Sequence, residues 1–425
     1  MSMNSERSSS SRCLIIPGPF LPYNDTITQL VYKQLRLLPM DYQVCALEGF
    51  SSDPALEKIM KEDPEFRKFH ITYTDQYQNV LFFIHNINLF RGLRHMNSYL
   101  QAAESMYSGQ EFIYSSCWPC YTARAAARIK KAHPEAKWIA SFSDPINHSP
   151  YKFDEETYRS YSLPEKICFR LYLKYYVVDE DEASAFEHAD LLVFIDEEQR
   201  DFQIEQYCRY FHRIPEEEIR KKCVIVPLNY IPEFNLMTHE PQKEPVHQSY
   251  TLSHFGRIYG LRVIEQFLYA FSDFRKHYPD VPVIIEQYGE FRKSDLKLIR
   301  KLGISECFRI HGKIPYAECI RKMQESDGVL LFDTILPENQ FQPYLPSKIL
   351  EYSYLKKNVL AVTTRKSPAY RIMKKTDAIA CRYDRNEIYQ GLVDLIINHK
   401  QSRIDYAYTN AEAIQDLRQR IESLK

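Results

Sequence analysis

A glycine and two arginines in the second half of the sequence have the types and spacing that a phosphate-containing ligand requires. Gly256 and Arg257 follow an apolar stretch that ends at Phe255, and Arg262 comes five residues after Arg257. Glycine lets the backbone approach a ligand closely, and guanidinium groups form paired hydrogen bonds with phosphate oxygens. Cations at a helix start oppose the helix dipole, so two arginines there are mildly unfavourable without a ligand. The pattern indicates a diphosphate site at the end of a strand.

A carboxylate further along the chain extends this set toward a nucleotide. Ser347 and Lys348 precede Glu351 at the start of a predicted helix. A carboxylate accepts hydrogen bonds from two neighbouring hydroxyls, as a ribose offers, and free N–H groups at a helix start bind phosphate. Ser347 and Lys348 fit a phosphate contact, and they fit equally well a helix cap beside a solvated cation.

Apolar runs alternate with helical patterns along the chain, which is typical of βαβ units and parallel sheets. The segment 239–248 has two prolines and no apolar periodicity, which predicts a linker. Strands are predicted before it over 13–17, 80–84, 112–115, 138–142, 191–195 and 224–227, and after it over 252–255, 283–286, 308–311, 328–332, 359–362 and 378–381. The fold class is therefore α/β, with two Rossmann-like, doubly wound domains.

These motifs resemble the donor-binding half of the family 4 glycosyltransferases, which have the two-domain GT-B fold. The family has Gly-Arg after the strand and a lysine where this chain has Arg262. Glu351 corresponds to the second glutamate of the family's pair, whereas Pro343 stands at the position of the first. The resemblance implies that Arg257 and Arg262 neutralise charge on the leaving diphosphate and that Glu351 binds the ribose.

The resemblance also assigns residues around the rest of the donor. His311 and Gly312 follow a predicted strand, in a loop that contacts the nucleobase in related proteins; a lone histidine at a strand end is also commonly structural. Gly18, in the first strand–helix turn, lets that loop approach the transferred sugar. The implied donor-binding set is Gly18, Gly256, Arg257, Arg262, His311, Gly312, Ser347, Lys348 and Glu351.

The first half carries a looser resemblance to bacterial polysaccharide glycosyltransferases. The stretch from Ser115 to Cys120 and the later Asp144-Pro145 match family turns, with Ser143 in place of an arginine. Asp144 at a strand end would hydrogen-bond an acceptor or sugar hydroxyl and joins Arg257 and Arg262 as a catalytic candidate. A turn cap before Pro145 explains it equally well.

The pair Cys117 and Cys120 also has the C-x-x-C spacing of redox and metal sites. The surrounding strands are too many for a thioredoxin domain, and no other Cys or His cluster has ligand spacing. We therefore expect neither a bound metal nor a cofactor other than the nucleotide-sugar co-substrate, whose base is open.

The resemblance implies the following organisation, in the order of the chain. A disordered tail over 1–12 precedes an acceptor-binding domain over 13–238, the linker over 239–248, a nucleotide-sugar-binding domain over 249–400, and a C-terminal helix over 401–425 that crosses back to the first domain.

The implied activity is a metal-independent, retaining, hexosyltransferase-type transfer from a nucleotide-diphosphate sugar to a hydroxyl of a glycan or polyprenyl-linked acceptor, in cell-surface polysaccharide synthesis. The alternative is a catalytically inactive GT-B module that stabilises an active transferase. Pro343 and Ser143 favour that alternative, whereas Arg257, Arg262 and Glu351 favour an enzyme.

Composition excludes other classes of protein. The 55 basic and 56 acidic residues nearly cancel, which argues against an obligate nucleic-acid binder. The first twelve residues have no apolar core of a signal peptide, and no apolar run is long enough to span a bilayer. Ten scattered cysteines then indicate reduced thiols, and we expect a cytoplasmic protein.

One amphipathic segment, 165–178, suggests contact with the inner face of the membrane. Lys166, Arg170 and Lys174 recur every four residues, and Ile167 and Leu171 belong to a different face of the same predicted helix. A basic, apolar helix of this kind can bind anionic lipid. The other interpretation is a core-facing helix with a solvated basic face.

Overall fold

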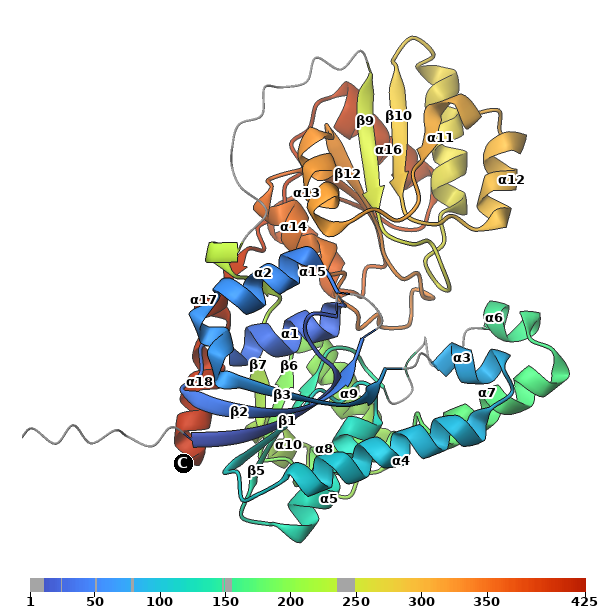
Figure 1. The fold of residues 1–425 in the computed structure, drawn as a ribbon. Coiled ribbons are helices and arrows are strands. Elements are labelled where there is room, and N and C mark those ends of the chain that lie inside the picture. Colours follow the sequence, from blue (N-terminus) through green and yellow to red (C-terminus); the bar gives the residue numbers. More distant parts are fainter. Residues whose placement is uncertain are drawn as a thin grey trace, which may run out of the picture. The chain divides into compact units, whose positions relative to one another are not determined.

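The computed structural model describes residues 11–23, 25–49, 52–77, 80–146, 149, 155–234 and 249–425 of the chain. The chain forms two units (Figure 1): unit 1 contains Met1–Pro227 and Asn410–Lys425, and unit 2 contains Leu228–Thr409. The predicted linker over 239–248 and the predicted tail up to residue 10 lie outside the described residues. The last sixteen residues, Asn410–Lys425, belong to unit 1 although the chain reaches them from unit 2.

Unit 1 is built on a seven-stranded parallel sheet with the order β3-β2-β1-β4-β5-β6-β7. This arrangement is the doubly wound Rossmann order with one strand added at the edge. The strands are β1 (Ser11–Pro19), β2 (Met40–Glu48), β3 (Phe69–Gln76), β4 (Phe112–Ser115), β5 (Lys137–Phe142), β6 (Leu191–Phe194) and β7 (Cys223–Ile225).

Helices connect these strands, and side-chain caps fix several of their starts. Asp25 accepts a hydrogen bond from the N–H of Thr28 at 2.7 Å in a capping box, and Asp196 accepts one from Gln199. The helical segments are α1 (Thr26–Leu35), α2 (Pro54–Glu62), η1 (Pro64–Lys68), α3 (Val80–His85), α4 (Leu89–Met106), α5 (Tyr121–Ala132), α6 (Glu155–Ser160), α7 (Leu163–Tyr175), α8 (Asp179–His188), α9 (Glu197–Tyr210), α10 (Glu216–Lys221), α17 (Asn410–Ala413) and α18 (Gln415–Leu424).

Unit 2 has a six-stranded parallel sheet with the order β11-β10-β9-β12-β13-β14, the Rossmann order without additions. Its apolar core includes Leu252, Phe267, Leu330 and Leu360, which are all buried. The strands are β9 (Tyr250–Phe255), β10 (Val283–Tyr288), β11 (Phe308–Ile310), β12 (Gly328–Phe332), β13 (Asn358–Val362) and β14 (Ile379–Cys381); β8 (Asn229–Tyr230) and β15 (Tyr408–Thr409) pair separately.

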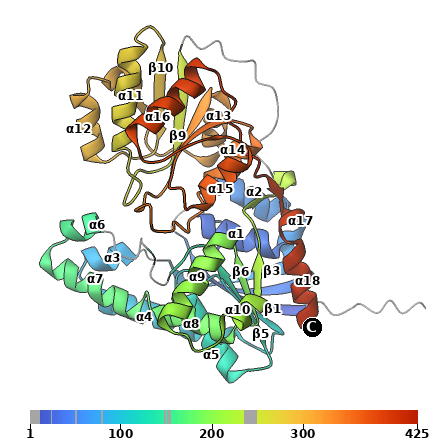
Figure 2. The same ribbon diagram turned by 180° about the vertical axis from the view of Figure 1, so that it is seen from behind.

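Helices cover both faces of the unit 2 sheet, and Figure 2 shows them from the back. They are η2 (Pro232–Phe234), α11 (Glu265–His277), α12 (Lys293–Lys301), η3 (Ser305–Cys307), α13 (Tyr316–Glu325), α14 (Lys348–Tyr354), α15 (Pro368–Lys375), α16 (Arg385–Leu392) and the π-helical η4 (Val393–Ile397). The N–H groups at the start of α16 bind the carboxylate of Asp384, and the hydroxyl of Ser367 caps α15.

The structure confirms the predicted fold class and all six strands predicted after residue 248. Before that point one strand prediction was wrong, because 80–84 lies in the helix α3. A short apolar run does not distinguish a strand from a buried helical turn. The prediction also missed β2 and β3. Within the described residues, no helix combines the length and apolarity that crossing a membrane requires.

Candidate functional site

The carboxyl ends of β9 and β12 form the switch point of the unit 2 sheet. These neighbouring strands lie where the strand order reverses, and ligands of open α/β sheets bind outside the carboxyl ends at such a point. Gly256 and Arg257 follow β9, and Asp333 follows β12. The predicted diphosphate residues therefore lie where the fold itself forms a ligand crevice.

The two predicted arginines share one aromatic ring. The guanidinium carbons of Arg257 and Arg262 each lie 5.3 Å from the ring centre of Tyr259. The Nε of Arg257 also lies 3.5 Å from a carboxylate oxygen of Glu290, and the Arg257 side chain is 66% exposed. The Nε of Arg262 is buried without a hydrogen-bond partner. Both cations are thus held near Tyr259 and keep donors available for an anion.

Two glycines let the ends of β9 and β10 approach each other at this place. A Cβ on Gly289, which follows β10, would lie 2.1 Å from the carbonyl oxygen of Gly256. The amide of Gln287 donates to that same oxygen at 2.7 Å, and the N–H of Gly256 donates to the carbonyl oxygen of Tyr288. Gly289 therefore fixes the course of the loop that presents Arg257.

A buried polar layer lies beneath the loop. The His254 ring lies 2.8 Å from the Gln287 amide oxygen; burial lowers the pKa of His254 to about 4, and the charge of Arg262 lowers it further. Burial raises the pKa of Asp333 to about 6, although Thr363, the Thr334 N–H, Arg262 and Gln342 all oppose the rise. Because both groups respond to Arg262, the arginine's charge acts on the carboxyl ends of β9 and β12.

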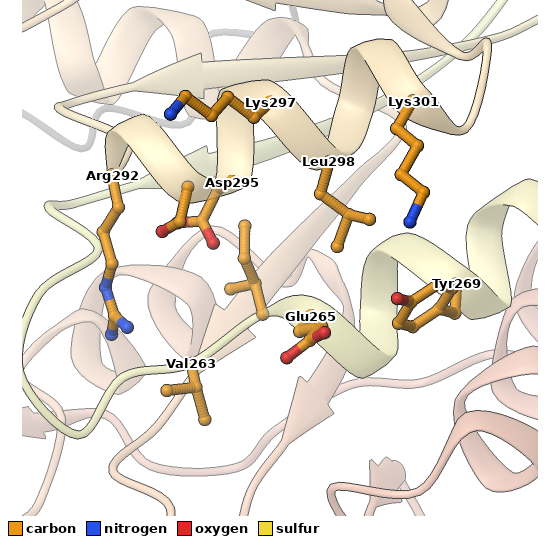
Figure 3. Close-up of a pocket in the computed structure, with 10 residues that line it drawn as sticks. Val263, Glu265, Tyr269, Arg292, Asp295, Lys297, Leu298 and Lys301 are labelled. Atoms are coloured by element: carbon orange, nitrogen blue, oxygen red, sulfur yellow. The ribbon is translucent and has the colours of Figure 1, made fainter.

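Arg292 holds the backbone beside Arg262. Its guanidinium donates to the carbonyl oxygens of Gly260, at 2.7 Å, and of Arg262. Figure 3 shows Arg292 at one side of a pocket of about 360 Å³ between α11 and α12, with Val263 of the same loop in its wall. Charged side chains of both signs line this pocket, among them Glu265 and Lys297. Arg292 is thus a structural support of the arginine loop.

Glu351 lies buried in α14 and forms a cluster with α13. Its Oε1 accepts from the Tyr316 hydroxyl at 3.3 Å and lies 3.6 Å from Lys348 Nζ. The Lys348 ammonium also lies 5.6 Å from the Tyr316 ring centre. The other carboxylate oxygen, Oε2, is buried without a hydrogen-bond partner. An unsatisfied buried carboxylate oxygen costs free energy, so Oε2 is an acceptor suited to a ligand hydroxyl.

Tyr352 joins this cluster to the switch point. It is fully buried and its hydroxyl donates to the Leu330 carbonyl in β12 at 3.2 Å. Burial raises the pKa of Tyr352, the charge of Glu351 raises it further, and Phe255 and Arg262 lower it. The structure therefore brings Arg257, Arg262, Lys348 and Glu351 to the carboxyl-end side of one sheet. Ser347 precedes α14 and makes no side-chain cap.

Pro343 leaves no carboxylate at the position of the family's first glutamate. It is buried beside Gln342, whose amide donates to Asp333 at 2.6 Å and whose oxygen accepts from the Tyr344 N–H. The nearby Glu338 is exposed and pairs with Arg382 at 2.8 Å. The loop after β12 is thus anchored to the buried layer by Gln342.

His311 lies at the end of an aromatic stack across three strands. Its ring stacks on Tyr288 with centres 4.6 Å apart, and Tyr288 stacks on Phe255 at 4.8 Å. The stack places His311 in the same row of strand ends as Gly256. Gly312 follows with a φ of 71° and open space in the direction of a side chain.

In unit 1 the predicted residue Gly18 faces protein atoms. A Cβ on Gly18 would lie 2.6 Å from the Pro119 ring, and its N–H donates to the Tyr99 hydroxyl at 3.0 Å. Pro119, in the loop after β4, therefore occupies the direction in which a side chain at residue 18 would extend. Burial also raises the pKa of the Cys117 thiol, which disfavours the thiolate of a redox cysteine.

Asp144 is exposed two residues after β5, whereas Ser143 beside it is buried and its hydroxyl has no hydrogen-bond partner. Asp144 is therefore accessible to a ligand of unit 1. Among the residues that the structure describes, no group of three or more His, Cys, Asp or Glu side chains is arranged to hold a metal ion.

Several residues of the unit 2 site were not predicted from the sequence. Asp333 and Gly289 directly follow strands, as Gly256 does, and the same rule would have found them. Tyr316, Gln342 and Arg292 gave no such signal, because their roles depend on contacts between segments far apart in the sequence.

No family model matches the sequence, and no curated protein matches it. Solved structures do match the fold. Anabaena HepE in complex with UDP aligns with a TM-score of 0.60 and 11% identity over 97% of this chain and 100% of that chain. Its complex with UDP-glucose gives a TM-score of 0.56 at 12% identity over 97% and 96% of the chains.

Two further solved structures show the same likeness. Sucrose-phosphate synthase from Thermosynechococcus elongatus has a TM-score of 0.55 at 11% identity over 98% and 94% of the chains. The lipopolysaccharide outer core galactosyltransferase WaaB has a TM-score of 0.54 at 10% identity over 97% and 99%. At these identities the likeness establishes the fold, which is the GT-B fold with two Rossmann-like domains.

Proposed function

We propose that the chain is a glycosyltransferase that uses a nucleotide-diphosphate sugar and binds this donor through unit 2. The observation that carries the proposal is the arrangement at the switch point of the unit 2 sheet. Arg257 and Arg262 are held at the ring of Tyr259, and the buried Glu351 has an oxygen without a partner. Two cations suit a diphosphate, and a carboxylate with a vacant acceptor suits a ribose hydroxyl. The complexes of HepE with UDP and UDP-glucose support the same ligand class.

Arg257 and Arg262 would lower the barrier by stabilising negative charge on the leaving diphosphate. Cations that are already positioned need little rearrangement when this charge develops, and that is the usual source of such catalysis. Ser347 and Lys348 lie at the start of α14, about one helical turn before Glu351. They would contact the phosphates or the sugar. His311 and the open Gly312 would border the nucleobase.

The finer parts of the proposal concern the acceptor. The acceptor would be a hydroxyl of a glycan or a lipid-linked sugar, held by unit 1 with the exposed Asp144 as a hydrogen-bonding group. Transfer would retain the anomeric configuration and would not use a metal ion. The biological context would be polysaccharide synthesis.

A panel of UDP, GDP and dTDP sugars tests the donor directly. A ligand that binds only the folded chain adds about 2.7 kcal/mol to the free energy of unfolding at a hundredfold excess over Kd, and the melting temperature rises as a result. The matching donor should also be consumed in the presence of acceptor glycans, and the NMR coupling constant of the new anomeric proton reports the stereochemistry. If no nucleotide sugar in the panel stabilises the protein, the donor site is assigned wrongly.

A second candidate is a GT-B module that binds a nucleotide sugar or a partner transferase without catalysis. The observation in its favour is the buried Pro343, which supplies no carboxylate where the resemblance expects one. A nucleotide sugar would then stabilise the protein but would be neither hydrolysed nor transferred to any acceptor in an extract of the source organism. This result would favour the non-catalytic module over the enzyme.

A further inference from the structure

Helix α7 of unit 1 exposes a stripe of large apolar side chains. Leu163, Ile167, Leu171 and Tyr175 follow one another at intervals of four, which places them on one broad face. Leu163 is 73% exposed and Ile167 54%, and the other two are also exposed. The sequence also allowed a helix whose apolar face packs on the core. The structure instead exposes Ile167 and Leu171 to solvent. Solvated apolar side chains that form a row are characteristic of an interaction surface.

Basic side chains border the stripe along one edge. Lys166, Arg170 and Lys174 each directly precede one of the apolar residues. Lys166 and Arg170 lie 5.6 Å and 6.0 Å from the ring centre of Tyr158, so their charges remain at an aromatic, outward edge of the helix. Long cationic side chains in this position can reach lipid phosphates while the apolar residues insert.

Glu165 is the single acidic residue of α7, and it is bound to the Ser162 backbone and hydroxyl at the helix start and to His85 of α3 at 2.9 Å. The opposite face packs inward through Cys168, which is buried, and through Phe169, whose ring lies 5.7 Å from Tyr161. The helix is therefore anchored on one face, and the apolar side chains of the other face are exposed.

The exposed stripe belongs to a helical arm of unit 1. In Figures 1 and 2, α4 and α7 run side by side, with α3 and α6 at one end of the pair. Phe90, at the start of α4, is 81% exposed and adds a further apolar side chain to this arm.

We propose that α7 is a docking surface for an anionic phospholipid bilayer. The apolar stripe enters the headgroup region, and Lys166, Arg170 and Lys174 bind lipid phosphate. Charge complementarity favours a bilayer over a second copy of the chain. Pairing two copies through this face about a twofold axis would bring Lys166, Arg170 and Lys174 of one copy close to the same cations of the other. The inference is independent of the reaction that the protein catalyses.

Vesicle sedimentation of the full chain tests the proposal. Wild type should sediment with phosphatidylglycerol vesicles and much less with phosphatidylcholine vesicles, and added salt should weaken binding. One variant removes the apolar side chains, a second reverses the basic side chains of α7, and a third reverses cations on another helix to test whether the position of the charges matters. These are Leu163→Gln/Ile167→Gln/Leu171→Gln, Lys166→Glu/Arg170→Glu/Lys174→Glu, and the control Lys293→Glu/Lys297→Glu/Arg300→Glu on α12.

The first two variants should each bind the anionic vesicles at least about tenfold more weakly than wild type, because apolar insertion and phosphate contact both contribute. The control helix α12 has exposed cations without an exposed large apolar side chain, so its variant should bind as wild type does. The three apolar sites on α7 are exposed, and an unchanged melting temperature verifies the fold of each variant.

Three results would overturn the proposal. They are absence of wild-type binding to anionic vesicles, equal binding by the Gln variant, and an equal loss in the α12 control. If the wild type instead dimerises without vesicles and the Gln variant does not, the stripe is an interface between two copies.

Discussion

The switch points of the two sheets have the same topology but differ in what lies above them. In unit 2 the turn after β9 exposes Arg257, and space remains around Gly256, whose nearest neighbour in the side-chain direction is His254 at 3.6 Å. In unit 1 the turn at the end of β1 is covered, because Pro119 occupies the space above Gly18. At equivalent places in the same strand order, the side-chain direction is thus open at Gly256 and filled by a neighbouring loop at Gly18.

The local charge differs in the same sense. In unit 1, Cys117 lies two residues after the end of β4. Burial raises the pKa of its thiol, and the carboxylates Glu182 and Asp181 raise it further. In unit 2, burial lowers the pKa of His254 and the charge of Arg262 lowers it further. The same charge opposes the rise that burial causes in the pKa of Asp333. A positive local charge favours an anionic ligand, so a diphosphate is expected at unit 2 and not directly above Gly18.

The largest effect should come from closing the open switch point. In Gly289→Ala the new Cβ would lie 2.1 Å from the Gly256 oxygen, so the loop that presents Arg257 must move. We expect nucleotide binding to weaken by more than about a hundredfold, which corresponds to about 2.8 kcal/mol, because the loop that carries both Gly256 and Arg257 is displaced. Isothermal titration calorimetry with the best nucleotide of the panel measures this change.

Two glycine variants serve as controls for Gly289→Ala. Gly303→Ala has a similar need for a positive φ, at 69°, but open space around it, so it should cost only about 1–2 kcal/mol of stability. Gly18→Ala should destabilise unit 1 through Pro119 and leave nucleotide binding intact. Weaker binding in Gly18→Ala would mean that the covered turn also contributes to the donor site.

The next effect separates the exposed arginine of the site from an ordinary surface arginine. Arg257→Ala should remove a charge-assisted contact worth about 1.5–3 kcal/mol, which is about ten- to a hundredfold in Kd. Arg309 is a matched control: it is similarly exposed and also lies 3.5 Å from a glutamate, Glu286. Arg309→Ala should bind as wild type does, and equal losses in both variants would indicate only a nonspecific charge effect.

The sequence predicted most strands of unit 2 well because strands such as β12 and β13 are buried on both faces and read as short apolar runs. In unit 1 the edge strand β3 is largely exposed, so it has no apolar run to detect. β2 alternates buried and exposed residues only over its first half. The segment 80–84 is apolar because α3 packs against α4 and α7, and Phe83 is buried there.

For the site, the sequence identified residues that directly follow strands, because topology alone places them at the crevice. It did not identify residues whose position depends on tertiary packing. Tyr316 reaches Glu351 from another helix, and Arg292 binds the backbone of Gly260 from thirty-two residues away. The closing of Gly18 by Pro119 likewise required the structure, since the two turns are about a hundred residues apart.

A moderate effect is expected from the buried carboxylate. Glu351→Gln keeps the size of the side chain and the contact with Tyr316, so the melting temperature should change little. If Oε2 accepts from the ribose, UDP binding should weaken about tenfold, as for a hydrogen bond to a charged group. The matched ligands are 2′-deoxy and 3′-deoxy UDP, which should lose affinity in wild type but not further in the variant. A variant that unfolds, or one whose loss is the same for all three ligands, contradicts a ribose contact.

The smallest effect concerns the influence of Arg262 on the buried layer. The folded pKa of His254, about 4, lies below its unfolded value, so His254 costs stability as pH falls from about 6.5 to 4. The folded pKa of Asp333, about 6, lies above its unfolded value, so Asp333 adds stability as pH falls from about 6 to 3.8. Arg262→Gln should raise both values, so both groups make the variant lose less stability than wild type between pH 6.5 and 4.

This difference should be below about 1 kcal/mol for each group, because burial and not Arg262 is the main cause of both shifts. Urea unfolding at several pH values measures it, and the NMR titration of His254 reports its pKa directly. Arg257→Gln is the control, since Arg257 is not among the causes of the His254 shift, and its pH profile should match wild type. If Arg262→Gln and Arg257→Gln have the same pH profile, the positive charge at the switch point does not come from Arg262, and the contrast with the switch point of unit 1 rests on its open backbone alone.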